Sequence, residues 1–356
     1  MRREAALAVV AVTAVLFWIF GGQWFGSFER LPFLGLLTVW LFAAVLTASF
    51  AVVRHADALA EQLGEPLGTL VLTLSVISIE VLMVTSIMLR GANNPELARD
   101  SMYAVVMIVL NGVVGLSLLL GGLRHREQQY NLQGANAFLA VIIPLAVLSL
   151  VLPTFTRSAP GPALSTVQEM FLVVASLGLY GVFLAVQTVT HRGYFIVGDA
   201  PTHHADGSSA AIHGLLLVAY LVPVVYLSEQ LAIPLDHAIE ELGAPSAFAG
   251  MVIALLVVSP EALGALRGAL ANQLQRSVNI ALGSAAATIG LTVPAVLLVC
   301  LCTGRSLLLG LEGTEAVMLM LTLLVSVVTL GSGRTSVLQG AVHLVLFLAY
   351  VVMVFD

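Results

Sequence analysis

The sequence predicts an all-α polytopic membrane protein of about eleven transmembrane helices, built as an inverted repeat of two five-helix halves plus an N-terminal helix. Its 356 residues are 59% hydrophobic and 10% charged, whereas a soluble domain carries about 25% charge. The apolar runs are continuous over the roughly 17 to 25 residues that a helix needs to cross a bilayer, and do not alternate as the strands of a barrel would. A polar pattern that recurs half a chain later indicates the repeat.

The expected spans are 5–20, 31–53, 67–89, 101–122, 134–152, 166–190, 210–228, 245–266, 278–302, 314–330 and 337–355. The first span follows Arg2 and Arg3, as the apolar part of a signal peptide would. However, Phe17-Trp18-Ile19-Phe20 at its end offers no small-residue cleavage site. We therefore expect residues 1–30 to hold a retained transmembrane helix.

The orientation follows from arginine, because all 14 basic residues are Arg and none is Lys. With the N-terminus inside, nine arginines lie in cytoplasmic segments and five outside, one of the latter being Arg99 in an outer loop. This excess predicts a cytoplasmic N-terminus and an outside C-terminus. The lack of lysine also excludes a Schiff base to retinal or pyridoxal phosphate, and no cofactor is expected.

The repeat is carried by a short polar pattern that precedes two of the spans. Its residues Asp57, Glu61, Leu63, Gly64 and Pro66 recur as Asp236, Glu240, Leu242, Gly243 and Pro245, at a constant offset of 179 (236 − 57). Five spans separate the copies, and an odd number reverses their orientation in the membrane. We expect a first half over 31–190 and a second half over 210–356, an inverted architecture found in many secondary transporters.

A polar segment over 191–209 joins the two halves and is expected to be cytoplasmic. It contains His203 and His204. A metal site would need further ligands that the sequence does not place, so a plain linker is the favoured interpretation.

Two glutamates carry the functional argument. Glu80 and Glu261 each lie near the middle of an apolar span, one in each half, at an offset of 181 (261 − 80). A carboxylate in hydrocarbon costs from a few to more than ten kcal/mol, so it usually faces a polar path and binds something. A structural hydrogen bond between helices is the alternative for either residue alone, but a symmetric pair predicts an ion site.

The pair suits both a metal cation and protons. Two carboxylates with hydroxyl, carbonyl and water oxygens can supply the roughly six to eight oxygen ligands that Ca²⁺ prefers. The same carboxylates can take up protons, because like charges close together favour neutralisation. Cation and proton would then compete for one site, and this competition gives antiport without a separate coupling device.

Several neighbours are expected to support the glutamates. Thr73 is seven residues before Glu80 and shares its helical face, and Ser78 precedes Glu80 by two. Ser259 and Pro260 directly precede the second glutamate, and Pro260 is expected to break the helix and leave a carbonyl one turn earlier without its donor. Carbonyls of this kind beside a carboxylate are cation ligands.

The spans that follow each glutamate add Asn111 in the first half and Ser284 and Thr288 on one face in the second. Gly112 and Gly115 accompany Asn111. Close helix packing is an equally good explanation for such small residues.

These segments resemble the calcium/cation antiporter superfamily, in particular its bacterial Ca²⁺/H⁺ antiporter (ChaA-type) branch. The resemblance covers roughly 57–300 and rests on Leu63-Gly64-Glu65-Pro66-Leu67-Gly68-Thr69 before Glu80, on Gly121-Gly122-Leu123-Arg124-His125-Arg126-Glu127 with Asn131-Leu132-Gln133-Gly134-Ala135-Asn136, on Pro260-Glu261, and on Ala271-Asn272-Gln273-Leu274-Gln275-Arg276-Ser277-Val278-Asn279. Membership implies ten core helices in two inverted repeats, with an acid from each repeat forming the exchange site. Those acids map onto Glu80 and Glu261, and the implied location is the bacterial inner (plasma) membrane.

The chain departs from this family's pattern at one point. Members of the wider group carry a Gly-Asn pair before each acid, where this chain has Val76-Ile77 and Val257-Val258. Losing two amide ligands makes a Na⁺(K⁺)/H⁺ antiporter credible beside a Ca²⁺/H⁺ antiporter using the same residues.

An intramembrane enzyme is the least favoured class. The sequence contains no His-Glu-x-x-His pair, no Gly-x-Ser-x-Gly elbow, and no paired aspartates in apposed spans. No nucleic-acid-binding patch or phosphate loop is evident, and no obligate protein partner is indicated. The expected partners are the transported cation, protons and the lipid bilayer.

Overall fold

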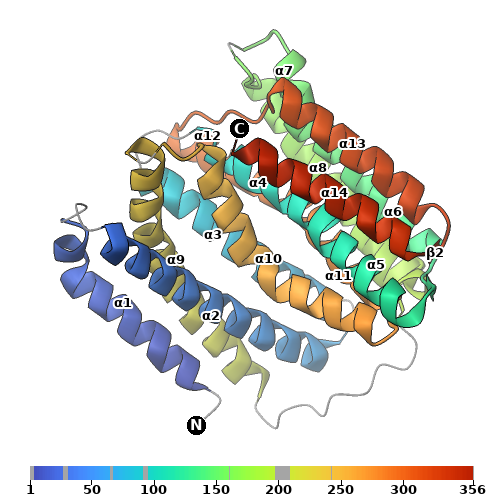
Figure 1. The fold of residues 1–356 in the computed structure, drawn as a ribbon, viewed down its shortest axis with the longest axis horizontal. Coiled ribbons are helices and arrows are strands. Elements are labelled where there is room, and N and C mark those ends of the chain that lie inside the picture. The colour runs from blue at the N-terminus through green and yellow to red at the C-terminus, as the bar shows by residue number, and fades with distance from the viewer. Residues whose placement is uncertain are drawn as a thin grey trace. The chain divides into compact units, whose positions relative to one another are not determined.

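The computed structural model describes residues 4–26, 31–64, 67–90, 95–159, 161–196, 209–241 and 243–355. Their helices (Figure 1) are α1 (Ala5–Trp24), α2 (Leu31–Leu63), α3 (Leu67–Arg90), α4 (Leu97–Met107), η2 (Ile108–Val113), α5 (Val114–His125), α6 (Leu132–Ala146), η3 (Val147–Val151), α7 (Leu152–Phe155), α8 (Thr166–Ala185), η4 (Val186–Thr190), η5 (Arg192–Tyr194), α9 (Ala210–Glu240), α10 (Ala247–Leu270), α11 (Leu274–Ala287), η6 (Thr288–Thr292), α12 (Val293–Thr303), α13 (Gly313–Leu330) and α14 (Val337–Val354). The strands are β1 (Gln128–Gln129) and β2 (Arg334–Thr335). His203 and His204 lie outside the described residues.

Among the described residues, eleven helical spans are long and apolar enough to cross a membrane, which confirms the predicted number. Several are longer than expected. α2 continues to Leu63 and α9 to Glu240, well past the predicted ends at residues 53 and 228. Charged residues end an apolar run in the sequence, but they do not end a helix whose polar face has partners inside the protein.

The turns of the repeated pattern share a backbone feature. Gly64, just after α2, and Gly243, after α9, have φ angles of 64° and 73°. This left-handed conformation suits glycine at the C-terminal end of a helix. Both copies of the pattern therefore hold a glycine in this conformation after a long helix.

The chain divides into two compact units that do not coincide with the sequence halves. Unit 1 comprises Met1–Asn94 and Thr202–Pro260, and unit 2 comprises Pro95–Pro201 and Glu261–Asp356. Unit 1 thus takes α1, α2, α3, α9 and the part of α10 up to Pro260, and unit 2 takes the rest of α10 and the last three spans of each half. The division falls between two spans in the first half and within a span in the second half.

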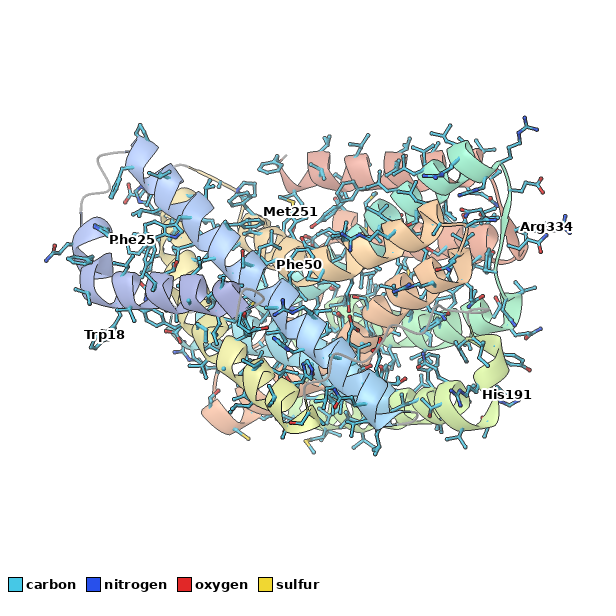
Figure 2. The ribbon with its side chains drawn as sticks, turned by 90° about the horizontal axis from the view of Figure 1, so that it is seen from below. Trp18, Phe25, Phe50, His191, Met251 and Arg334 are labelled. Carbon is cyan, nitrogen blue, oxygen red and sulfur yellow. The ribbon has the colours of Figure 1, made fainter. Side chains whose placement is uncertain are left out.

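In unit 1, α2 packs against α1, α3 and α9, and α3 also packs against α9. Figure 1 shows α1, α2 and α9 side by side. Phe17 of α1 meets Trp24 and Trp40 edge to face, with ring centroids 5.2 and 5.4 Å apart. Trp18 points away from the other helices in Figure 2 and is 77% exposed, as suits a lipid-facing side chain.

Unit 2 joins segments from both sequence halves. α14 packs along α5, as Figure 1 also shows, and α12 packs along α8. The two contacts are equivalent under the repeat, because α5 and α12 belong to the third span of their halves and α8 and α14 to the fifth. The third span of each half also contains a π-helical turn, η2 in the first half and η6 in the second. Two other π-helical turns, η3 and η4, have no counterpart in α13 and α14, so η2 and η6 form the matched pair of the described residues.

A small antiparallel strand pair links the halves once more within unit 2. Gln128 of β1 pairs with Thr335 of β2, and Gln129 pairs with Arg334. The connection between α5 and α6 is thereby held against the connection between α13 and α14.

Candidate cation-exchange site

Glu80 lies near the middle of α3, as predicted, and is 1% exposed. Its neighbour Ile79 is equally buried. α3 packs against α2 and α9 within unit 1, so this carboxyl group lies inside the protein and not toward lipid. A carboxyl group that binds an ion within the membrane must face the protein interior, and Glu80 does so.

The serines around Glu80 donate to the backbone of their own helix. The Ser78 hydroxyl donates to the carbonyl oxygen of Leu74 at 2.6 Å, and the Ser75 hydroxyl to that of Val71 at 2.7 Å. A hydroxyl that donates in this way still offers oxygen lone pairs. Ser78 therefore keeps the capacity to contribute an oxygen ligand, and Thr73, on the same helix, is half-buried.

Glu261 lies in α10 at a half-buried position, directly after Pro260. The Ser259 hydroxyl donates to the carbonyl oxygen of Leu255. Ser78 and Ser259 stand two residues before their glutamates, and their acceptors Leu74 and Leu255 differ by the same offset of 181 (255 − 74). The two glutamates therefore share the same local arrangement.

Pro260 does not end its helix, because α10 is continuous over Ala247–Leu270. The expected break in the helical path is thus absent. A proline still has no N–H to donate, so the Leu256 carbonyl cannot receive its usual helical hydrogen bond. The loss of one donor leaves a carbonyl oxygen with unused acceptor capacity, although the helix stays intact.

Asn111 lies in η2 and is fully buried. Its amide nitrogen donates to the Thr322 hydroxyl at 2.8 Å, and its amide oxygen lies 3.2 Å from Nδ1 of His343. An amide oxygen can only accept, so His343 Nδ1 carries the proton. The amide is thereby fixed at both ends, and its oxygen retains a second lone pair.

His343 is a buried polar residue that the sequence reasoning missed. It lies on α14 with an exposed fraction of 0%, and its Nε2 lies 3.0 Å from the Thr329 hydroxyl. A single histidine inside the apolar span 337–355 is the signal that would have identified it, since ionisable residues in such spans are costly. Its position depends on a close approach of helices: a Cβ added to Gly115 would lie 3.1 Å from the Cβ of His343.

Ser284 and Thr288 are both buried, with exposed fractions of 9% and 2%. Ser284 lies in the last turn of α11, and Thr288 begins the π-helical turn η6. Thr288 and Asn111 thus both lie in the π-helical turn of the third span of their half. A π-helical turn misaligns the helical ladder and is common at functional sites.

The candidate residues are divided between the two units. Thr73, Ser78, Glu80, Ser259 and Pro260 belong to unit 1, whereas Asn111, Glu261, Ser284 and Thr288 belong to unit 2. Within the described ranges, no three His, Cys, Asp or Glu side chains are grouped so as to hold a metal ion.

Arg99 is a buried charged residue that the sequence reasoning misplaced. Arg99 was expected in an outer loop, but it lies in the first turn of α4 and is 4% exposed. Its Nε donates to Asp100 at 2.8 Å, and its guanidinium also reaches Glu96 at 3.3 Å and the Gly310 carbonyl at 3.2 Å. The span starts at Leu97 and not at residue 101, because these partners neutralise the charges that seemed to end it.

Comparison with known proteins shows the family of the chain. The family model described as sodium/calcium exchanger protein matches residues 33–189 and 212–355. These two segments nearly coincide with the two predicted halves.

Named relatives cover almost the whole chain. The y4hA protein of Sinorhizobium fredii is 46% identical over 91% of this chain and 90% of its own length. The protein of Escherichia coli named sodium-potassium/proton antiporter ChaA is 39% identical over 98% of this chain and 94% of its own. The protein of Bacillus subtilis named Ca²⁺/H⁺ antiporter ChaA is 25% identical over 92% and 93%.

Among solved structures, native YfkE has the same fold. It matches with a TM-score of 0.76 and 19% identity over 98% of this chain and 99% of its own. The sequence resemblance is thus confirmed. With a family model that matches both halves, the chain belongs to the sodium/calcium exchanger protein family, whose members are membrane cation antiporters and not enzymes.

Proposed function

We propose that this chain exchanges Ca²⁺ for protons across the membrane, with Glu80 and Glu261 as the shared carriers of cation and proton. The observation that supports this most is the matched pair of serine–glutamate arrangements, one on α3 and one on α10. Each half thus provides one carboxylate and, two residues earlier, one hydroxyl oxygen that can act as a cation ligand. Two negative charges also match the charge of Ca²⁺.

Neutral oxygens complete the proposed ligand set. Thr73, Ser78 and Ser259 are its members on α3 and α10, together with the carbonyl beside Pro260. Asn111, Ser284 and Thr288 are the proposed contributors from η2, α11 and η6. Each offers an uncharged oxygen, so the site is neutral when both carboxylates hold either one Ca²⁺ or two protons.

A Na⁺(K⁺)/H⁺ antiporter is the second candidate. It is favoured by the 39% identical relative, whose name specifies sodium and potassium, and by Val76-Ile77 and Val257-Val258 in place of amide ligands. A monovalent cation is held with less negative charge and fewer strong ligands. It would displace one proton, with the other carboxyl group staying protonated.

The two candidates differ in how affinity depends on pH. Each proton that a cation must displace raises its apparent KM about tenfold per pH unit on acidification, while the carboxylates titrate. Ca²⁺ displacing two protons gives a slope of about −2 in a plot of log KM against pH, and Na⁺ or K⁺ displacing one gives a slope of about −1. Inside-out vesicles with a pH-sensitive dye, supplied with each cation in turn, measure this slope.

The site assignment is tested by charge-neutral variants in the same vesicles. We expect Glu80→Gln and Glu261→Gln to abolish exchange, because neither amide can release a proton to a cation. Glu127→Gln is the matched control, since Glu127 is exposed on the α5–α6 connection. Folded Glu80 or Glu261 variants that transport at the wild-type rate would refute the role.

The serines provide a graded test of the same site. Ser78→Ala or Ser259→Ala removes one proposed oxygen ligand and leaves both carboxylates in place. We expect the apparent KM for the cation to rise about tenfold, which corresponds to about 1.4 kcal/mol. Ser75→Ala is the control, because Ser75 makes the same backbone bond in α3 but is not in the proposed ligand set.

A further inference from the structure

A polar cluster in unit 1 lies outside the proposed exchange site. It consists of Glu4 at the start of α1, Arg54 and His55 on α2, and His213 and Tyr220 on α9. The Glu4 carboxylate accepts from Arg54 Nη2 at 3.0 Å and from the Tyr220 hydroxyl at 3.1 Å, and it lies 3.3 Å from His55 Nε2. One carboxylate thus connects three helices.

Two histidines form the buried part of this cluster. Nδ1 of His55 lies 3.0 Å from Nδ1 of His213, and the side chains are buried, with exposed fractions of 2% and 6%. Two ring nitrogens at this distance need one hydrogen between them, so one ring donates and the other accepts. His213 Nε2 is also buried and has no hydrogen-bond partner within the described part of the chain.

This geometry limits how many protons the pair can hold. A neutral pair has one hydrogen in the Nδ1–Nδ1 contact, and a first added proton goes to the outer nitrogen of the donating ring and leaves that contact intact. A second added proton sets one N–H against another at 3.0 Å and forces the rings apart. The pair therefore has a closed state with at most one extra proton and an open state with two.

The histidine pair has polar neighbours on α1, α2 and α9. Glu4 faces it from α1, Arg54 from α2 and Tyr220 from α9, with the Tyr220 ring stacked 5.7 Å from that of His55. Glu4, Arg54 and His213 are the charged or titratable groups that act electrostatically on His55, and no group of α3 is among them. In the described residues no group of three such side chains that could hold a metal ion is found. The ring nitrogens 3.0 Å apart share a hydrogen, so the ligand considered for this pair is a proton.

We propose that His55 and His213 form a regulatory proton-binding site, distinct from the glutamate pair, that controls transport by holding α2 to α9. The proposal rests on the proposed antiport function. Both helices pack against α3, which carries Glu80. Separation of the two rings by a second proton loosens the contact between α2 and α9 and so disturbs the helix of the exchange site.

Vesicle transport at a saturating cation concentration tests this site. The pH of the face that bears the N-terminus is varied, and wild type is compared with His213→Asn, whose amide replaces Nδ1 but takes up no proton. Wild-type exchange is expected to fall on the acid side by about tenfold per pH unit once the second proton binds, whereas the variant lacks this fall. His191→Asn, an exposed histidine, is the control and should follow wild type.

The proposal is overturned if His213→Asn and wild type share one pH profile. Should the variant fail to fold, ¹⁵N NMR of ring-labelled wild-type protein in detergent decides instead. The two rings should then titrate in two coupled steps, and two independent single-step titrations would overturn the proposal. Failure of the proposed antiport is recognised separately, because wild-type vesicles would then show no cation-dependent proton exchange at any pH.

Discussion

Substitution of Gly340 by alanine tests how strictly the contact between α5 and α14 is set. A Cβ at this position would lie 2.8 Å from the carbonyl oxygen of Gly115 and 2.8 Å from Cα of Leu119. Both atoms belong to backbone and cannot rotate away. Since carbon atoms in contact normally lie about 3.5–4.0 Å apart, the helices must separate by up to about 1 Å.

The expected cost follows from two opposing effects. Overpacking of this kind costs about 1–3 kcal/mol, and replacement of a helical glycine by alanine returns about 0.5–1 kcal/mol. Gly178→Ala in α8 is the matched control, because no heavy atom lies within 4 Å of a Cβ there. Gly178→Ala gains only the stabilisation that alanine gives a helix, so the free energies of unfolding of the two variants should differ by about 1–3 kcal/mol.

The same separation affects the polar contact inside the helix pair. His343 donates to Asn111 at 3.2 Å, already near the limit of a good hydrogen bond. We therefore expect Gly340→Ala to reduce transport as well as stability. Thermal unfolding in detergent and vesicle exchange measure the two effects, and a Gly340→Ala protein that unfolds with Gly178→Ala and transports normally would refute the reasoning.

Two further substitutions test buried polar groups. His343→Leu should lower the free energy of unfolding by about 1–3 kcal/mol, because the Asn111 oxygen loses its donor, and should raise the apparent KM for the cation. His343→Asn keeps a donor near the place of Nδ1 and should restore most of the affinity in vesicle assays. Equal KM values for the two variants would argue against a role of His343 in positioning Asn111. Arg99→Leu leaves the Asp100 carboxylate buried without its counter-charge, and we expect a loss of about 3–5 kcal/mol in thermal unfolding. The exposed Arg124→Leu serves as its control, and a similar small effect of both would show that the buried ion pair contributes little.

The sequence was sufficient for the number of spans, the repeat and the family, because each depends on patterns that extend over many residues. Twenty apolar residues predict a span whatever their neighbours are. The ends of the spans were less accurate, and α2 shows the reason. After residue 53 charged and polar residues become frequent in α2, but Arg54 and His55 have partners on α1 and α9, which no local pattern reveals.

The site residues were predictable in part. The two glutamates stand out against apolar surroundings, whereas His343 acquires meaning only once α14 is known to lie against α5. The continuity of α10 through Pro260 was also not predictable, since a proline can either break a helix or be accommodated in it. Whether Glu80 and Glu261 act as one site stays a prediction.

The strand pair β1–β2, together with the packing of α14 on α5 and of α12 on α8, has an evolutionary consequence. Each of these contacts joins one sequence half to the other, so a single half contains too few helices to complete unit 2. Before the duplication, a five-helix ancestor would have had to assemble as a dimer, with its two copies inserted into the bilayer in opposite directions. Gene fusion would then have joined the two copies in one chain, so that separate polypeptides no longer had to associate.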